Sequence, residues 1–326
     1  DKDKDKVKKP KVPYDYPGDV INIISAVAGN KVIVAWPSRY CTGGNPGYAM
    51  DDETKAAVAS YLGLGEYDIY VEDLFGVAGS QGFIDYAEED FPEVGQVPFS
   101  CLWAARGTLE YDAETNLYDL VWRGAERLTS GVRDVNRVEV AIAAGAGAIV
   151  VWQEDPEGLR PGQGEGPGEG WSGAIANHQT DIWYSWVGWD EFDIVEATDG
   201  SLIPYSEYTE DTMPKAGIPM AVPVRVSDNA KCNVDNPKPY CDYEVASLYG
   251  LKNFCADVID RSSTVKSPLC ATEDGVVLVG NTASTRPRVA LHSYTKADGS
   301  TSAWVVFASE ESKGLGAFFF DADGNS

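Results

Sequence analysis

The chain has 326 residues, with 51 Asp and Glu against 26 Lys and Arg, and therefore a formal net charge of -25. This charge repels phosphate backbones and anionic lipid, which argues against nucleic acid and the membrane surface as partners. With 44% hydrophobic residues the chain is too apolar to be wholly disordered. No apolar run approaches the ~20 residues of a membrane-spanning helix, so we expect no membrane insertion.

Export is expected on two grounds. The first residue is Asp rather than Met, from which we expect that a leader has been removed. The six cysteines are an even set without CxxC spacing, and disulfides persist in oxidising compartments. Short spacing suggests two pairs and leaves the third. The expected disulfides are Cys41 with Cys101, Cys232 with Cys241, and Cys255 with Cys270. The alternative is a set of buried thiols.

Residues 1–17 alternate Asp and Lys and then carry three prolines. Such a segment has no apolar period and cannot order itself, so we expect an extended arm. The arm is either a solvated tail or a strand that lies on a partner.

Three hairpins follow along the chain, each made of two apolar runs joined by a turn rich in Gly, Asn or Asp. The expected strand pairs are Val20–Val27 with Lys31–Trp36, Arg137–Ala143 with Ala148–Gln153, and Arg288–Tyr294 with Ser302–Ala308. Because helical periodicity is weak, we predict an all-β fold.

The second and third hairpins are internal repeats in sequence. Arg137 aligns with Arg288, and Glu154–Asp155 aligns with Glu310–Glu311. Similar segments, Glu126–Ser130 and Val224–Asp228, precede them. Repeated antiparallel strands that cannot bury both faces alone are what a β-propeller is made of.

We therefore predict β-propeller-like antiparallel blades with long loop insertions. The propeller-like domain spans residues 18–326, with blade units at residues 18–130, 131–230 and 284–326 and a disulfide-stapled insertion at residues 231–283. The first unit adds a strand at Tyr67–Asp73 and another near Arg127, and the second adds Asp181–Ser185 and Pro223–Ser227. Since a closed propeller needs about four to eight blades, we expect an incomplete ring. A continuation past Ser326 or a partner would complete it.

Seven residues are candidates for binding. Three arginines, Arg39, Arg137 and Arg288, lie near the hairpins, and sialidase-type propeller glycosidases gather arginines to hold a carboxylate. The acidic candidates are Glu154, Asp155, Glu310 and Glu311. A glycosidase needs two carboxylates about 5 to 10 Å apart, and the sequence singles out no such pair. Structural pairing of each arginine with a nearby acidic motif is the preferred interpretation.

Calcium is the candidate ion, because Asp321, Asp323 and Asn325 resemble the start of an oxygen-donor loop. The motif stops before a bidentate carboxylate. The two histidines, His178 and His292, stand apart, and no haem attachment motif is present, so we expect no covalent cofactor. The glycine-rich segment Gly158–Gly173 lacks a phosphate-loop ending and instead suits close contact with a neighbouring surface.

Several stretches match one family pattern in order, across most of the chain from about Val32 to Gly316. They are Pro37–Cys41, Gly44–Tyr48, Asp73–Gly82, Val97–Trp103, Arg133–Arg137, Trp152–Leu159 and Thr272–Gly275. These stretches resemble the bacterial surface proteins called choice-of-anchor O proteins. The resemblance implies export and display on the cell surface, and no catalytic activity comes with it. The sequence departs from the family pattern by ending without an anchor and before the later repeats.

Three functions remain open on the sequence. The first is a secreted or cell-surface binding and structural protein, a subunit or decoration of an extracellular assembly, whose partners are other protein chains. The second is a carbohydrate-active propeller enzyme of sialidase-like type. The third is an accessory protein of an extracellular electron-transfer filament. We favour the first, and therefore expect that the chain is not an enzyme and works by contact.

Overall fold

The computed structural model describes residues 20, 22–42, 77, 79–86, 95–155, 158, 180–208, 215–227, 253–259, 266–272 and 282–313. Several predictions lie outside these residues. They are the arm of residues 1–17, the strand Tyr67–Asp73, the glycine-rich loop after Gly158, the pair Cys232 and Cys241, and the calcium candidates Asp321, Asp323 and Asn325.

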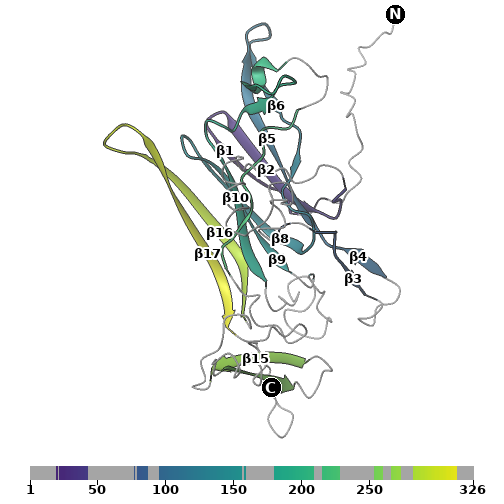
Figure 1. Cartoon of the computed structure of the whole chain (residues 1–326). Helices are drawn as coiled ribbons and strands as arrows, with labels where there is room; N and C mark the ends of the chain where they lie inside the picture. The colour runs from purple at the N-terminus through teal and green to yellow at the C-terminus, as the bar shows by residue number, and fades with distance from the viewer. Residues whose placement is uncertain are drawn as a thin grey trace, which may run out of the picture.

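Two larger sheets and one long hairpin form the body of the described chain (Figure 1). The first sheet contains β1 (Ile24–Ala28), β2 (Lys31–Ser38), β5 (Cys101–Asp112), β6 (Leu117–Trp122) and β7 (Glu126–Arg127), in the order β1-β2-β5-β6 with β7 also on β5. The second sheet has the order β13-β10-β9-β8, from β8 (Asp134–Ala143), β9 (Gly147–Asp155), β10 (Asp181–Gly188) and β13 (Val224–Arg225). The third hairpin joins β16 (Thr282–Thr295) to β17 (Thr301–Lys313).

Shorter elements surround this body. They are the strand pairs β3 (Phe83–Asp85) with β4 (Gln96–Pro98), β11 (Ile194–Glu196) with β12 (Leu202–Pro204), and β14 (Asn253–Ile259) with β15 (Lys266–Thr272), and the 3-10 turn η2 (Tyr205–Glu207). The prediction of an all-β fold is confirmed, and the three predicted hairpins are present. Among the described residues, no helix is long and apolar enough to cross a bilayer.

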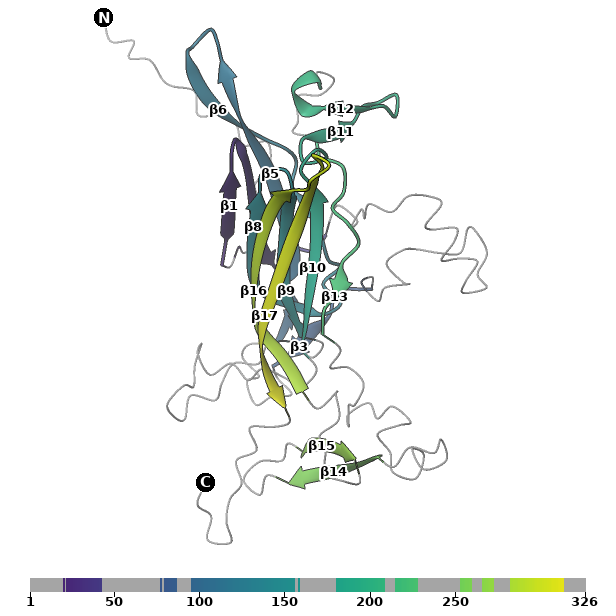
Figure 2. The ribbon, with the colours of Figure 1, turned by 90° about the vertical axis from the view of Figure 1, so that its left-hand side faces the viewer.

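The two sheets and the third hairpin stack face to face in chain order (Figures 1 and 2). Ile33 and Leu102 of the first sheet pack with Val150 and Trp152 of the second in one buried cluster. On the opposite face of the second sheet, Ile149 and other buried residues receive the third hairpin. Successive blades of a propeller stack in this way, and the described layers form an open stack rather than a closed ring.

The three hairpins share one register. In each hairpin, three residues of the first strand face two of the second between two matching residue pairs, so that one extra residue forms a β-bulge. The matching pairs are Val20 with Ser38 and Ile24 with Ala35 in the first hairpin, Val135 with Glu154 and Glu139 with Val151 in the second, and Ser284 with Glu311 and Arg288 with Ala308 in the third. The hairpins are therefore repeats of one unit in backbone geometry as well as in sequence.

A residue with positive φ occupies the same place in every bulge. It is Asn22 at φ 52°, Arg137 at φ 50° and Arg286 at φ 53°. The alignment of Arg137 with Arg288 is therefore wrong by two residues, and Glu154 matches Glu311 rather than Glu310. Matching the Arg-Val letters misplaced the repeat because the bulge, which the letters do not mark, sets the register.

The third and fourth strands repeat as well. Trp103 of β5 lies opposite Arg127 of β7, and Trp183 of β10 lies opposite Arg225 of β13. The predicted outer strands near Arg127 and at Pro223–Ser227 are confirmed. The third strand of the first sheet among the described residues is β5, whereas the sequence suggested Tyr67–Asp73.

Side-chain hydroxyls hold these outer strands in the same way in both sheets. The hydroxyl oxygen of Thr129 accepts a hydrogen bond from the amide of Leu102 at 3.0 Å, and that of Ser227 accepts one from Ile182 at 2.9 Å. The similarity of Glu126–Ser130 to Val224–Asp228 therefore reflects a common structural role.

One backbone hydrogen bond recurs between successive layers. The amide of Val135 in β8 donates to the carbonyl of Ser100 at 3.0 Å, and the amide of Ser284 in β16 donates to Thr180 at 2.8 Å. Val135 and Ser284 are equivalent in the hairpin register, and Ser100 and Thr180 each precede the third strand of a sheet. This bond sets the offset from one layer to the next.

The predicted Cys41–Cys101 disulfide is present, and it joins the segment after β2 to the start of β5. The backbone register sets Cys255 opposite Cys270. The disulfide between these two, like that between Cys232 and Cys241, stays a prediction.

Replacing Cys41 and Cys101 together by Ser should lower the free energy of unfolding by about 4 kcal/mol, because the bond closes a loop with a sequence separation of 60 residues. Urea denaturation of the oxidised proteins measures the change. Peptide mapping without reduction should recover the Cys41–Cys101 peptide, and a native protein whose Cys41 thiol reacts with iodoacetamide would contradict the assignment.

The bulge predicts opposite responses at two nearby arginines. At Arg137, where φ is positive, Arg137→Val should be less stable than Arg137→Gly by about 1–2 kcal/mol, because a β-branched residue is strained there. At Arg288, two positions after the bulge residue of β16, Arg288→Val should instead be more stable than Arg288→Gly. Urea denaturation of the four variants decides, and the same order at both positions would refute the shared bulge.

Candidate functional site

Two of the predicted arginines meet where the second sheet touches the third hairpin. Arg288 forms an ion pair with Glu139, and neighbouring Arg286 pairs with Glu310 at 2.9 Å. Desolvation, together with the positive charges of Arg286 and Arg288, lowers the pKa of Arg137, while Glu310 opposes the effect. The predicted residues Arg137, Arg288 and Glu310 thus lie in one charged group across two layers.

The other predicted residues occupy different places. In the shared hairpin register, Ser38 is equivalent to Glu154, so Arg39 is equivalent to Asp155 and not to Arg137. Asp155 is fully buried and lies opposite Asp134. Glu311 lies opposite Ser284 at the base of the third hairpin. The seven candidates therefore do not converge on one centre.

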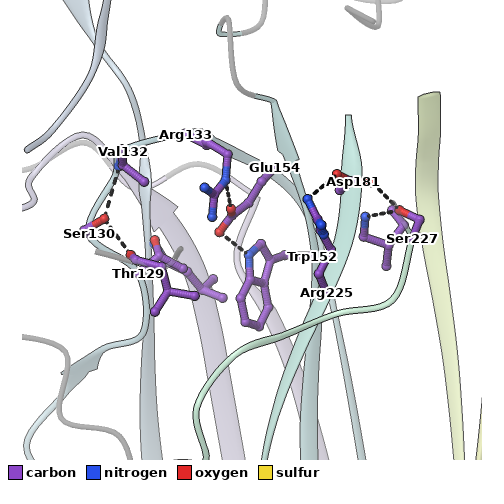
Figure 3. Close-up of polar contacts among 12 residues, drawn as sticks. Thr129, Ser130, Val132, Arg133, Trp152, Glu154, Asp181, Arg225 and Ser227 are labelled. Carbon is purple, nitrogen blue, oxygen red and sulfur yellow. Dashed lines mark hydrogen bonds and ion pairs between the residues drawn. The ribbon is translucent and has the colours of Figure 1, made fainter. Parts of the chain in front are cut away.

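A second polar group gathers at the end of β9, and Glu154 is its buried anion (Figure 3). Nε of Arg133 lies 2.6 Å from one carboxylate oxygen of Glu154. The indole N–H of Trp152 donates to the other oxygen at 2.9 Å. Both oxygens are therefore engaged by donors from the protein.

Asp181 of β10 lies directly opposite Glu154 and has its own partners (Figure 3). The hydroxyl of Ser227 donates to Asp181 at 2.7 Å, and Arg225 lies 3.6 Å from the other oxygen. The two guanidinium groups approach the ring of Trp183, with Arg133 at 4.6 Å and Arg225 at 5.9 Å from its centroid. Two arginines, each paired with a buried carboxylate, thus lie against the ring of Trp183.

This Arg-Trp cluster, made of Arg133, Trp152, Glu154, Asp181, Trp183, Arg225 and Ser227, neutralises its own charges. The carboxylates of Glu154 and Asp181 are each engaged by an arginine and by a second donor of the protein, which does not suit the acid of a glycosidase, whose carboxyl group must reach the substrate. The indole nitrogen of Trp183 is buried without an acceptor among the described groups. The Arg-Trp cluster is therefore a set of polar contacts that join neighbouring strands.

A separate ionic network anchors the turn after β10 on the first sheet. Nζ of Lys31 lies 2.6 Å from Asp193, Arg123 lies 2.9 Å from it, and the Thr108 hydroxyl donates to it at 2.6 Å. Burial alone would raise the pKa of Asp193, but the hydrogen bonds from Lys31 and Thr108 and the charges of Lys31 and Arg123 outweigh it and lower the pKa. The ionised carboxylate is therefore the form that holds the two layers.

Arg106 extends this anchoring deeper into the first sheet. It is buried, pairs with Glu126 at 3.3 Å and donates to the carbonyls of Phe192 and Ile218. Burial raises the pKa of Glu126, and the charge of Arg106 opposes the effect. A Cβ at Gly217 would meet the guanidinium group at 2.3 Å, so a side chain there would displace the end of Arg106 from this position. Arg106 is a structural residue.

The described residues contain no group of three or more His, Cys, Asp or Glu side chains that could hold a metal ion. Comparison of the chain with family models, with curated proteins and with solved structures finds no match. The resemblance to the choice-of-anchor O proteins therefore stays a prediction.

Sequence reasoning missed most of the Arg-Trp cluster. It identified Glu154 but not Arg133, Asp181 or Trp183. One signal was available, because Trp36 and Trp152 occupy equivalent positions in the second strands and face Trp103 and Trp183 in the third. The network around Asp193 left no local signal, because its members come from distant segments.

The cluster predicts that the two ion pairs of the second sheet and third hairpin differ in their effect on stability. Glu154→Gln should lower the free energy of unfolding by roughly 2–4 kcal/mol, because both oxygens of the buried Glu154 carboxylate accept from Arg133 and the Trp152 indole, and the new amide group would set a donor against one of these donors. The matched control Glu310→Gln breaks an exposed pair and should cost less than about 1 kcal/mol. Urea denaturation compares them, and equal costs would show that the cluster is not an anchor.

Proposed function

We propose that the chain is a secreted or cell-surface structural and binding protein that works by contact as a subunit of an extracellular assembly. The observation that carries the proposal is the outer face of the third hairpin, where Tyr294, Trp304 and Val306 are exposed together. A cluster of large apolar side chains on a surface marks a site of contact with another molecule.

Export is supported by the Cys41–Cys101 disulfide. The bond lies in a buried cluster with Trp103, against which Trp36 and Tyr40 pack. Disulfides of this kind persist where the surroundings are oxidising, outside the cytoplasm. The strongly negative charge of -25 suits a surface that repels lipid and nucleic acid and meets other proteins or cations.

A role in contact fits the polar clusters better than a catalytic role does. The carboxylates of Glu154 and Asp181 are held by arginines, and Arg39 is not equivalent to Arg137. The sialidase-like alternative needs converging arginines and an available acid, and the described residues favour it less. No observation favours the electron-transfer accessory over other assemblies.

Chemical cross-linking on intact producing cells tests the proposal. Cross-links from Lys296, at the tip of the third hairpin, should join the chain to other protein chains in the extracellular or surface fraction. The purified protein should carry the Cys41–Cys101 disulfide and should not turn over sialosides or aryl glycosides.

Two results would contradict the proposal. One is recovery of the protein only from the reducing cytosol, without the disulfide and without cross-links to other chains. The other is steady glycoside turnover that is lost in Arg137→Ala but kept in the control Arg39→Ala. The second result would favour the enzyme.

A further inference from the structure

The two ends of the stack present opposite faces of one repeating contact. Each layer has two apolar faces. We call the face that packs on the preceding layer the covering face, and the face on which the following layer packs the receiving face. The receiving face of the first sheet carries Ala26, Ile33 and Ala35, and that of the second sheet carries the equivalent Ala141, Ile149 and Val151. By the shared register, the receiving face of the third hairpin carries Ala290, Val306 and Ala308.

None of the elements that the structure describes covers this last receiving face. Ile33 and Ile149 are 0% and 2% exposed, whereas the equivalent Val306 is 59% exposed. Trp304, on the same face, is 63% exposed, and its ring is tilted relative to that of Tyr294, with ring centroids 6.3 Å apart. In Figure 2 the third hairpin lies in front of β8, β9 and β10, with its receiving face toward the viewer. The hairpin thus offers the surface that both earlier layers bury.

The covering face is open at the other end of the stack. In the second sheet, Val138, Val150 and Trp152 of this face are buried against the first sheet. The equivalent residues of the first sheet are Ile23, Val34 and Trp36. Here the open part of the face is the part near β1, where Ile23 is 60% and Val27 is 61% exposed. Val34 is half-buried, and Trp36 is half-buried against the Cys41–Cys101 cluster.

We propose that a second copy of this chain joins these two faces, the covering face of one copy on the receiving face of the next. The inference rests on the proposed function and names its partner. The contact is the same one that the chain already makes twice within itself, and each copy carries one face of each kind. Such a head-to-tail contact builds a ring if it closes and a filament if it does not.

The occupant is a copy of the chain because the receiving face needs two antiparallel strands with apolar residues at alternate positions and the same bulge. The first sheet has this geometry, with Asn22 in the bulge and valines along β2. Two copies would bring together six of the described layers, which falls within the about four to eight blades of closed propellers. Because each chain carries a charge of -25, the contact should strengthen as salt rises.

Sedimentation of the oxidised full chain over a range of concentrations and salt tests the contact. The wild-type chain should associate, and more so at high salt. Val306→Glu on the receiving face and Val27→Glu on the covering face should each lower the association constant at least about 100-fold, because either buries a carboxylate in an apolar contact. Leu202→Glu, at an exposed position of β12 outside both faces, is the matched control and should leave association unchanged.

Mixing the two variants gives the sharpest result. The Val306→Glu chain keeps its covering face and the Val27→Glu chain keeps its receiving face, so together they should form a complex of one chain of each. Each variant alone should stay a monomer with an intact Cys41–Cys101 disulfide.

Three outcomes would overturn the inference: a monomeric wild-type chain at all salt concentrations, a mixture that stays monomeric, or a single variant that still associates. If one of these outcomes is found but the chain is cross-linked on cells to different proteins, the proposed function stands and a second copy of the chain is excluded as the partner. If the cross-links are absent as well, both fail.

Discussion

Each layer of this protein is apolar on both faces, and a sheet of that kind needs a neighbour on each side. In the second sheet, Ile149 and Val151 point to the third hairpin while Val150 and Trp152 point to the first sheet, and all four are buried. Because apolar burial is the main favourable term in folding, this alternation drives the layers to stack. The stack, rather than any single sheet, is the folding unit.

The repeated bulge and the recurring interlayer hydrogen bond give the stack a constant offset. Arg137 and Arg286 adopt the same left-handed conformation in equivalent strands, although an arginine at positive φ is unfavourable. The amides of Val135 and Ser284 then bind the same carbonyl position of the preceding layer. Because the contact between layers recurs with one geometry, the exposed faces at the ends of the described stack indicate the geometry of a partner layer.

Buried ion pairs fix the position of one layer relative to the next, and most of the buried charged groups described are engaged in such pairs. The anions of Asp193 and Glu154 are each held by cationic side chains, and Asp193 joins two layers. Removing one partner of such a pair costs more than the pair contributes, so these groups act mainly on specificity of packing. Among the described residues, the exposed apolar faces rather than these polar clusters are therefore the basis of the function that we propose.

The sequence alone determined the all-β class, the three hairpins and the Cys41–Cys101 pair. Alternating apolar residues and turn glycines are local signals, and the similarity of Glu126–Ser130 to Val224–Asp228 marked the outer strands. Of the Arg-Trp cluster, we selected Glu154 alone and overlooked the repeated tryptophans, and its partner Arg133 stands 21 residues away on another segment.

Tertiary structure decided the register of the repeat, the place of β5 beside β2 and the partners of each arginine. A bulge adds one residue without changing the letters around it, so Arg137 was matched with Arg288 instead of Arg286. Pairing of β2 with β5 joins segments more than 60 residues apart, and period-two alternation does not say which strands will meet. Which faces stay open follows from that pairing, because exposure belongs to the stack and not to any one segment.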